Sequence, residues 1–340
     1  MVKVAVIEGD GIGPEVVKAT LQVLEELKKR YSLPLEFTFV EAGDRAKEKY
    51  GDPLPKESYQ KILESDAILK GPVGETAADV IVRLRRELDL YSNIRPAKTL
   101  PGVPALKEDI DIVIVRENIE DLYIGAEYIL PPTSVGQRVA IGTRLTSERE
   151  TRRIAKVAAE YAKMRKNKVT IIHKANVMRV TCGLFREVAR EVLEKEGVEV
   201  DEMYVDAAAM ELVRNPHRFD VMLTPNVFGD ILSDLAAQVV GSLGLAPSAN
   251  VGDERALFEP VHGAAFDIAG KGIANPIATM LASAMMLEWL EMKKGMENGR
   301  KAAEDLRKAI EKALTDGKKT KDLGGELGTF EFTEEVIKRL

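Results

Sequence analysis

Residues 2–14 read Val2-Lys-Val-Ala-Val-Ile7-Glu-Gly9-Asp-Gly11-Ile-Gly13-Pro14, and the class of the fold follows from them. The run Val2–Ile7 is almost wholly apolar, as in a strand that is buried on both faces. Pro14 suits the first turn of a helix, and a helical pattern continues to Lys29. A buried strand, a glycine-rich turn and a helix together indicate an α/β fold.

The same alternation of strand-like and helix-like segments continues along the chain. Further strands are predicted at Leu35–Val40, Ala67–Leu69, Ile110–Val115, Val169–Ile172 and Asp220–Thr224. Further helices are predicted at Ser58–Leu63, Val80–Leu90, Ser147–Arg165 and Leu184–Lys195. We therefore expect an α/β protein with mainly parallel sheets.

The composition limits the classes of function. The 340 residues carry a net charge of −6 and no basic block, so neither nucleic acid nor an anionic membrane is expected as a partner. The single Cys182 excludes an intrachain disulfide and fits a reducing compartment. Val2–Ile7 is too short for a signal peptide, and Ile277–Leu290 is shorter than the ~20 residues of a membrane span. We expect a cytoplasmic protein of two domains.

Two segments look like crossings between the domains, namely the proline-rich Ile94–Pro104 and Gly241–Asn250. If both cross, the larger domain is discontinuous and comprises residues 1–97 and 244–340, and the smaller domain comprises residues 98–243. A cleft between two such domains is a favoured ligand site.

Residues 122–144 have a different character. Pro131-Pro132 lies at the centre, with the β-like runs Leu122–Ile129 and Gln137–Ile141 on either side. We predict a hairpin arm. Isolated hairpins are marginally stable in water, so we expect this one to pack on a second subunit.

The string Asn226-Val-Phe-Gly-Asp230-Ile-Leu-Ser-Asp234 follows a predicted strand. Asp230 and Asp234 are one helical turn apart and would share a helix face. Two like charges so placed cost stability unless a cation lies between them, and a divalent cation prefers oxygen ligands. A solvated acidic helix face fits the same pattern equally well.

Cations also gather at predicted strand ends. Arg116 follows Ile110–Val115, and ligands bind at the carboxyl ends of strands in open α/β sheets. Together with Arg85 and Arg95, Arg116 would suit a substrate with several carboxylates, although each arginine taken alone is more readily explained as a surface ion pair. Lys174, next to His173, could act as a general base.

Two glycine-rich segments could lie near a nucleotide. The turn Gly9–Gly13 resembles a dinucleotide-binding loop, but Pro14 stands where the third glycine belongs and Asp10 would repel a pyrophosphate. We interpret it as a tight turn. The segment Phe258–Pro276 is rich in Gly and Ala, which allows its backbone to approach a flat ligand closely. Asp267 within it could accept hydrogen bonds from the two hydroxyls of a ribose.

Together these strings resemble the β-decarboxylating hydroxyacid dehydrogenases of the isocitrate/isopropylmalate dehydrogenase family, from Gly9 almost to the C-terminus. The resemblance implies that family's two-lobed α/β fold, which is not Rossmann, with mainly parallel sheets and a β-hairpin dimer arm. It implies cofactor binding by residues 1–97 and 244–340, and dimerisation by residues 98–243. It further implies a homodimer or tetramer whose active sites are shared between subunits.

The resemblance also implies roles for individual residues. Tyr123 and Lys174 match the catalytic pair. The substrate-binding positions are Arg85, Arg95, Arg116, Val82 and Ile81. The ligands of Mg²⁺ or Mn²⁺ are Asp206, Asp230 and Asp234. Asp206 and the catalytic Lys174 would come from a second copy of the chain. The cofactor-binding positions are Ile12, Asn176, Asn226, Glu259, His262, Gly263, Ala265, Asp267, Ile268 and Asn275.

The implied reaction is the NAD-dependent oxidation and decarboxylation of (2R,3S)-3-isopropylmalate to 4-methyl-2-oxopentanoate, CO2 and NADH in leucine biosynthesis. Lys174, or a water that it controls, takes the proton of the 2-hydroxyl, and Tyr123 protonates the enolate left by CO2. Asp267 can bind a ribose 2′-hydroxyl but would repel a 2′-phosphate, which favours NAD⁺ over NADP⁺.

The choice of substrate depends on the turn before Arg85. Ala78, Ile81 and Val82 form an apolar face, against which an isopropyl group gains roughly 0.8 kcal/mol per buried CH2. An unpaired carboxylate would lose several kcal/mol there. Many bacterial isopropylmalate enzymes carry Glu and Leu-Leu in this turn, where this chain has Ala78 and Ile81-Val82, and the string Gly71–Asp79 resembles an archaeal subtype. Homoisocitrate and isocitrate stay open as substrates, as does activity on more than one of them.

Two other classes of protein remain to be compared. A Rossmann-type 2-hydroxyacid reductase would use the Gly9–Gly13 turn with Glu41 as its ribose ligand, without metal or CO2 release. A two-lobed solute-binding protein would need a secretion signal and no paired carboxylates. Only the decarboxylating enzyme should lose turnover on chelation by EDTA.

Overall fold

The protein, in a computed structural model that describes residues 1–131 and 136–340, divides into two compact units. The first comprises Met1–Leu90, Arg95–Ile110 and Ala236–Leu340, and the second comprises Tyr91–Ile94 and Asp111–Leu235. The sequence-based limits at residues 97 and 243, and the roles assigned to the two domains, stay a prediction.

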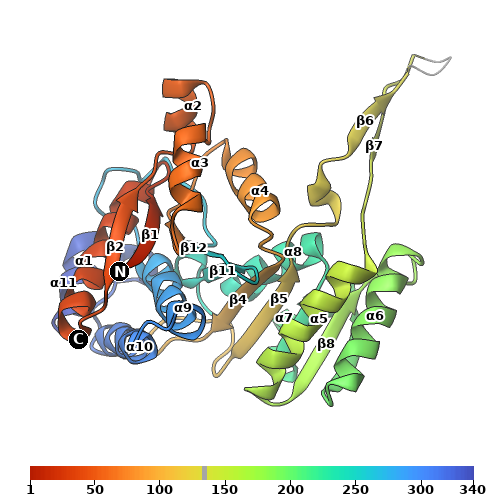
Figure 1. Ribbon diagram of the computed structural model, residues 1–340. Helices are drawn as coiled ribbons and strands as arrows, with labels where there is room; N and C mark the ends of the chain where they lie inside the picture. The colour runs from red at the N-terminus through yellow and green to blue at the C-terminus, as the bar shows by residue number, and fades with distance from the viewer. Residues whose placement is uncertain (132–135) are drawn as a thin grey trace. The chain divides into compact units, whose positions relative to one another are not determined.

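The first unit contains most of the helices (Figure 1). Its strands are β1 (Val2–Ile7), β2 (Leu35–Phe39), β3 (Ala67–Lys70), β11 (Pro247–Val251), β12 (Ala256–Pro260) and the end of β4 (Ser92–Lys98). Its helices are α1 (Gly13–Tyr31), α2 (Asp44–Tyr50), α3 (Lys56–Leu63), α4 (Ala77–Glu87), α9 (Ile277–Lys294), α10 (Gly299–Thr315) and α11 (Thr329–Ile337).

The sheet of the first unit runs β2-β1-β3-β12-β11. β1 lies parallel to both β2 and β3, β12 is parallel to β3, and β11 returns antiparallel to β12. Helix α9 packs on β11 and β12 and is buried over most of its length. The apolar segment Ile277–Leu290 is therefore a core helix, and no helix in the described ranges is long and apolar enough to cross a membrane.

The second unit carries a four-stranded parallel array in the order β5-β10-β8-β9. These strands are β5 (Asp111–Glu117), β10 (Val221–Thr224), β8 (Lys168–His173) and β9 (Glu199–Tyr204), and the helices are α5 (Glu148–Lys163), α6 (Thr181–Lys195), α7 (Val205–Arg214) and the larger part of α8 (Asn226–Val239). Helices α5 and α6 pack on each other and on this array. The predicted α/β class with mainly parallel strands is confirmed.

The hairpin arm is present, but it is shorter than predicted. β6 (Glu127–Leu130) pairs antiparallel with β7 (Val139–Gly142), whereas Leu122–Ile124 is a 3₁₀ turn. The turn forms because the Asp121 carboxylate accepts from its first N–H and left-handed Gly125 ends it. Pro132, half of the predicted Pro131-Pro132 centre, lies outside the described residues.

Both predicted crossings contain strand residues. β4 covers residues 94–98 of the first crossing, with Pro96 inside the strand, and β11 begins within the second at Pro247. Proline is tolerated at the first residue of a strand and wherever its missing N–H faces no acceptor. That the chain passes between domains at these two segments stays a prediction.

The turn after β1 is packed against the protein's own backbone. A side chain at Gly9 would come within 1.9 Å of the Pro72 carbonyl oxygen, and one at Gly11 within 2.0 Å of that of Ala264. The Asp10 carboxylate accepts from the backbone N–H groups of Asp44 and Gly74 at 2.9 and 3.1 Å. These contacts fit a tight turn and argue against a Rossmann phosphate loop.

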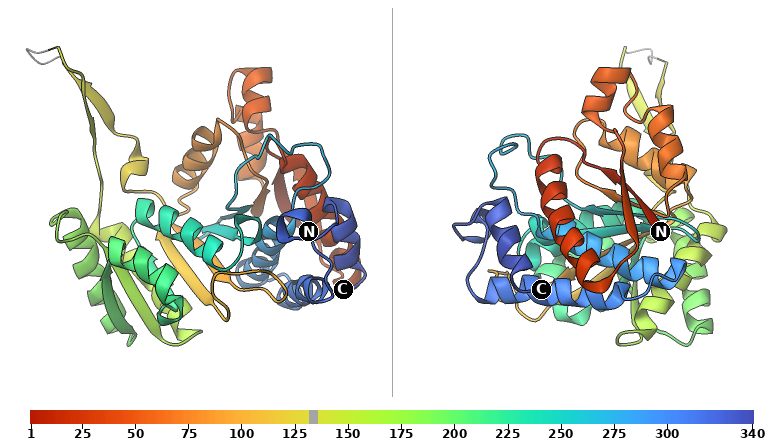
Figure 2. Two further views of the ribbon diagram at one scale, coloured as in Figure 1. Left: turned by 180° about the vertical axis from the view of Figure 1, so that it is seen from behind. Right: turned by 60° about the vertical axis from the view of Figure 1, so that its left-hand side comes forward.

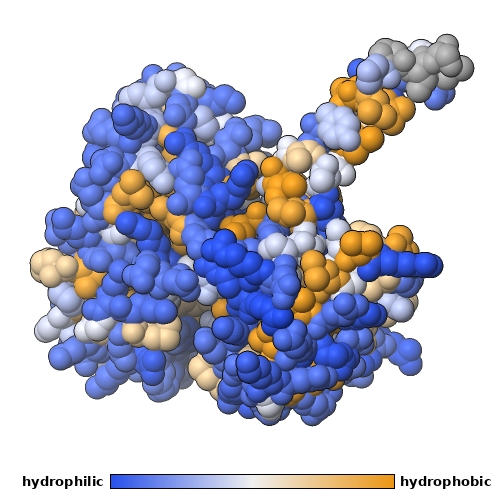
Figure 3. All heavy atoms as spheres, turned by 45° about the vertical axis from the view of Figure 1, so that its right-hand side comes forward, coloured by the Kyte–Doolittle hydropathy of each residue, from blue (hydrophilic) through white to orange (hydrophobic). Residues whose placement is uncertain are grey.

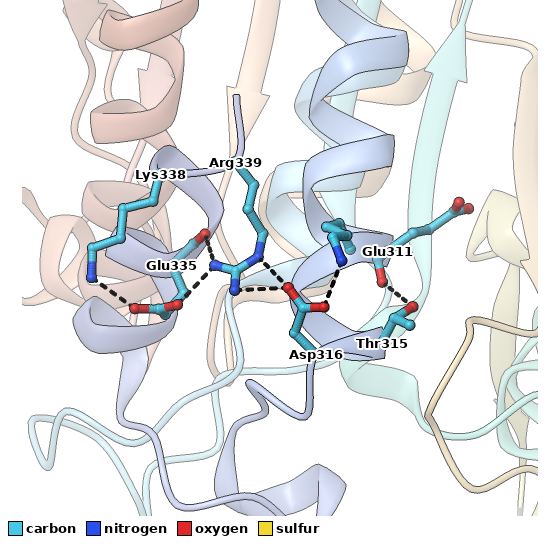
Figure 4. A network of polar contacts seen from close by, with 7 residues as sticks. Glu311, Thr315, Asp316, Glu335, Lys338 and Arg339 are labelled. Atoms are coloured by element: carbon cyan, nitrogen blue, oxygen red, sulfur yellow. Dashed lines mark hydrogen bonds and ion pairs between the residues drawn. The ribbon is translucent and has the colours of Figure 1, made fainter.

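Helix α11 closes the first unit beside α1, and both views in Figure 2 show the two ends of the chain in this unit. Arg339 donates to Asp316 at 3.0 and 3.1 Å and to Glu335 at 2.7 Å, which ties the end of α11 to the end of α10 (Figure 4). Because the network is in contact with water, each ion pair contributes little to the stability of the fold. Its main effect is to hold the end of α11 in place beside the end of α10.

The core of the first unit predicts a mutational cost. Phe258 in β12 is 1% exposed and its ring lies edge-on to Trp289, with 6.2 Å between centroids. Phe258→Ala should lower the free energy of unfolding by about 3–5 kcal/mol. Phe39→Ala, at a strand-end phenylalanine that is 55% exposed, should cost under about 1 kcal/mol. Urea unfolding of both variants measures the difference, and equal losses would contradict this assignment of the core.

Candidate active site

A buried arginine organises the polar cluster of the second unit. Arg116, near the carboxyl end of β5, is 1% exposed. Its Nε donates to Asn226 Oδ1 at 2.9 Å, and its Nη1 forms an ion pair with Asp230 on α8. Gly229 permits this approach, because a side chain there would come within 2.6 Å of the Arg116 side chain. Among the described residues, Arg116 Nη2 is buried without a hydrogen-bond acceptor.

Tyr123 joins the same cluster. Its hydroxyl donates to Asp230 Oδ2 at 2.5 Å, and the Arg116 guanidinium carbon lies 5.1 Å from the centre of its ring. The structure thus brings Arg116, Tyr123, Asn226 and Asp230 together from three elements, namely β5, the 3₁₀ turn Leu122–Ile124 and α8. Asp234 lies one turn further along α8 and is exposed.

A second cluster lies at the ends of β8 and β9. Lys174 Nζ lies 2.6 Å from Asp206 Oδ1, with 23% and 62% of the two side chains exposed. The hydrogen bond from Lys174 lowers the pKa of Asp206, which keeps that carboxyl ionised. Asn176 is exposed in the loop that follows Lys174.

The three aspartates predicted as metal ligands have the chemistry that suits a hard cation. Asp206, Asp230 and Asp234 offer only oxygen atoms, which Mg²⁺ and Mn²⁺ prefer, and all three remain at least partly accessible. Within residues 1–131 and 136–340, no three His, Cys, Asp or Glu side chains form a set that could hold a metal.

In the first unit, Arg85 of α4 is held in a buried ion network. Its Nε donates to Asn250 Oδ1 at 2.8 Å, and Asn250 donates in turn to Glu259 Oε1 at 2.8 Å. Lys70 lies 2.7 Å from the other oxygen of Glu259. Burial by itself would raise the pKa of Glu259, but the charges of Lys70 and Arg85 overcome it and lower the pKa to about 2.

This network explains two positions that the sequence left poorly defined. Glu259, predicted to contact the cofactor, has its carboxylate engaged by Lys70 and Asn250, so its effect on a cofactor would be indirect. Lys70 was not predicted at all, although a lysine that ends the apolar strand Ala67–Lys70 is a usable signal of a buried ion pair. Arg95 on β4 is also buried, at 7% exposure.

The loop between β12 and α9 carries most of the predicted cofactor residues. Ile12 and Ile268 belong to one apolar cluster, and Ile12 N–H donates to the Ala264 carbonyl at 2.8 Å. Ala265 has φ +42°, a strained conformation of the kind often found at ligand sites. Gly263 and Asp267 are exposed, and Asn275 donates to Asp322 at 3.0 Å.

His262 in this loop offers a nitrogen for a ligand. Its Nδ1 lies 3.1 Å from the Gly263 carbonyl oxygen, and its Nε2 is buried without a hydrogen-bond partner among the described residues. Burial lowers the pKa of His262, so the ring is neutral at physiological pH.

The turn of α4 before Arg85 carries the apolar side chains that the sequence predicts for the substrate. Val82 is half-buried, and half-buried Ile81 also packs against the core of the first unit. Ala78, one turn earlier, is exposed.

The Glu259 network predicts a pH-dependent stability. The carboxyl pKa falls from its ordinary 4.5 to about 2 on folding, so its contribution is complete above pH 4.5 and is lost as the pH falls toward 2. Glu259→Gln should therefore cost about 3 kcal/mol at pH 7 and progressively less below pH 4.5. Glu254→Gln, at an exposed position of the same hairpin, is the control. Denaturant unfolding between pH 7 and pH 3 measures both, and a gap independent of pH would contradict the prediction.

Comparison with known proteins completes the description of the site. A family model described as isocitrate/isopropylmalate dehydrogenase matches residues 3–337. A 3-isopropylmalate dehydrogenase of Sulfurisphaera tokodaii is 53% identical over 99% of this chain and 98% of its own length. A homoisocitrate dehydrogenase of Methanocaldococcus jannaschii is 44% identical over 99% of this chain and 97% of its own. A crystal structure of isocitrate dehydrogenase from Methylococcus capsulatus superposes with a TM-score of 0.92 at 39% identity, covering 100% of this chain and 99% of that one.

Proposed function

Because the chain belongs to the isocitrate/isopropylmalate dehydrogenase family, we propose that it oxidises and decarboxylates 3-isopropylmalate, with NAD⁺ and Mg²⁺ or Mn²⁺. The products are 4-methyl-2-oxopentanoate, CO2 and NADH, and the reaction belongs to leucine biosynthesis. The apolar turn of α4 carries the choice of substrate. Ile81 and Val82 present hydrocarbon one turn before Arg85, where a third carboxylate would need a positive partner.

The arginines would bind the two carboxylates of the substrate. Arg116 is buried, and its Nη2 has no acceptor within residues 1–131 and 136–340, which leaves N–H donors for a carboxylate oxygen. Arg85 cannot turn away freely, because Asn250 holds its Nε at 2.8 Å. Lys70 and Arg85 both lie within ion-pair distance of Glu259, at 2.7 and 3.6 Å, so this region of the first unit holds two buried cations.

Two side chains would move protons. Lys174 lies at a strand end and would take the proton of the 2-hydroxyl, directly or through water. Tyr123 donates its hydroxyl hydrogen to Asp230 and would protonate the enolate that remains after CO2 leaves. Asp206, Asp230 and Asp234 would hold the metal, and His262, Asp267, Ile268 and Asn275 would hold the adenosine. When bound, the metal makes the hydroxyl more acidic and the nicotinamide accepts the hydride.

The comparison of substrates tests this function. We expect kcat/KM with NAD⁺ and Mg²⁺ or Mn²⁺ to be highest for 3-isopropylmalate, above homoisocitrate, isocitrate and malate. EDTA should abolish turnover, and readdition of the metal should restore it. A higher kcat/KM for homoisocitrate or isocitrate would contradict 3-isopropylmalate as the preferred substrate. It would mean that the third carboxylate of the tricarboxylate has a positively charged partner in the site. Turnover that survives EDTA would exclude the reaction itself.

The cofactor preference predicts the effect of one substitution. Asp267 is exposed in the adenosine loop and would repel a 2′-phosphate. Asp267→Lys should lower the preference for NAD⁺ over NADP⁺ by roughly tenfold or more, which corresponds to about 1.4 kcal/mol. Glu297→Lys makes the same change of charge at an exposed position after α9 and should leave the ratio unchanged. An unaltered ratio in both variants would refute the role of Asp267.

A second subunit would complete the active site. The arm and the helices that carry Asp206 and Asp230 expose large apolar side chains, among them Ile129 at 64%, Met210 at 64% and Ile231 at 62%. Apolar colour runs along the arm in Figure 3. Exposed apolar surface of this kind marks an interface, and a homodimer or tetramer would cover it.

Mixed dimers test the sharing of sites. We expect Lys174→Met and Asp230→Asn homodimers each to be nearly inactive. After mixing and subunit exchange, one site of each mixed dimer would be intact, so random pairing should restore about a quarter of wild-type activity. Exchange is verified by native mass spectrometry. Mixed dimers without restored activity would mean that Lys174 and Asp230 act from the same chain.

A further inference from the structure

Asp121 has a backbone conformation that aspartate rarely adopts. It lies between β5 and the 3₁₀ turn Leu122–Ile124, is 2% exposed, and has φ +66° and ψ −141°. Only glycine reaches this region without strain, and strained residues persist where the surrounding contacts hold them. The contacts of the Asp121 side chain therefore need an explanation.

The carboxylate of Asp121 connects three separate elements. It accepts from the N–H of Leu122 at 2.9 Å, at the start of the turn that carries Tyr123. It accepts from the N–H of Val227 at 3.0 Å, in the first turn of α8, three residues before Asp230. It also pairs with Arg144, whose Nε and Nη2 lie 2.8 and 3.0 Å from its two oxygens.

Arg144 attaches this arrangement to the foot of the arm. It follows β7 by two residues, and its guanidinium carbon lies 4.7 Å from the centre of the Phe228 ring on α8. The backbone of Asp121 makes a second connection, because its N–H donates to the Leu145 carbonyl at 3.0 Å. The arm foot, the Tyr123 turn and the first turn of α8 therefore meet at one side chain.

We propose that Asp121 is a positioning residue that sets the contact between Tyr123 and Asp230 and fixes it to the foot of the arm. This inference rests on the proposed function for its catalytic consequence. One carboxylate binds the backbone on both sides of the 2.5 Å contact, at Leu122, one residue before Tyr123, and at Val227, three residues before Asp230. A rotation of either element would break one of its hydrogen bonds.

Asp121→Asn is the direct test. Asparagine tolerates positive φ and keeps the shape, so the substitution removes mainly the charge that binds Arg144 and the two N–H groups. We expect kcat to fall about tenfold or more, because a positioned general acid contributes roughly 10²–10⁴-fold to the rate and the substitution would remove part of this. The KM values for 3-isopropylmalate and NAD⁺ should each change less than about twofold. The subunit count by light scattering should stay that of wild type.

A spectroscopic readout separates positioning from catalysis. The protein has eight tyrosines, and after labelling with 3-fluorotyrosine the ¹⁹F resonance of Tyr123 is identified by its absence in Tyr123→Phe. In Asp121→Asn this resonance should shift or broaden and the other seven should not. Asp109→Asn is the matched control, because Asp109 also has positive φ, at 56°, but is exposed in the first unit. It should alter neither the spectrum nor kcat.

The outcomes divide clearly. An unchanged Tyr123 resonance with kcat within about twofold of wild type would overturn the proposal, as would a loss of activity that only follows the folded fraction. If Asp121→Asn does not fold, the same measurements are made on Arg144→Gln. In that variant too, kcat should fall and the ¹⁹F resonance of Tyr123 should shift or broaden. If wild type turns over none of the substrates, the proposed function fails, and the ¹⁹F shift alone still tests the positioning.

Discussion

The second unit depends on the burial of one guanidinium. A positive charge that is 1% exposed destabilises a fold unless it is paired and hydrogen-bonded, and Arg116 meets this condition with Asn226 and Asp230. Both partners belong to α8, so pairing the charge also fixes that helix against β5. The close approach requires a residue without a side chain at Gly229. Tyr123 then binds the same Asp230, and the geometry of the cluster follows from the cost of burying one charge.

The first unit buries charge in a comparable way. Lys70 and Arg85 enclose Glu259 in the core, with Asn250 as the link between acid and arginine. In both units, then, an arginine is held in place by an asparagine that accepts from its Nε, Asn250 for Arg85 and Asn226 for Arg116. Such pre-organised cations bind an anion without first losing the side-chain entropy of finding it.

Much of the fold could be predicted from the sequence, because hydrophobic period and turn residues are local properties. The strand Val2–Ile7 and the helix with Pro14 in its first turn are recognisable in this way. The strands β4 and β11 are harder to predict, since proline marks both linkers and tolerant strand positions. The pattern of hydrophobicity predicts a strand at Leu122–Ile124, and the observed 3₁₀ turn there has a different cause, the carboxylate of Asp121. Likewise, Asp230 was singled out by its spacing, whereas Lys70 and Asp121 depend on partners far away in the sequence.

The strand order of the first unit has a consequence for synthesis on the ribosome. β12 lies between β3 and β11, yet it is made about 190 residues after β3. At roughly 5–20 residues per second, β3 is left as an open sheet edge for about 10–40 s while the second unit is translated. An unpaired edge is a template for pairing with another nascent chain. The charge on Lys70, at the end of that edge, is present throughout this interval, well before Glu259 exists to neutralise it.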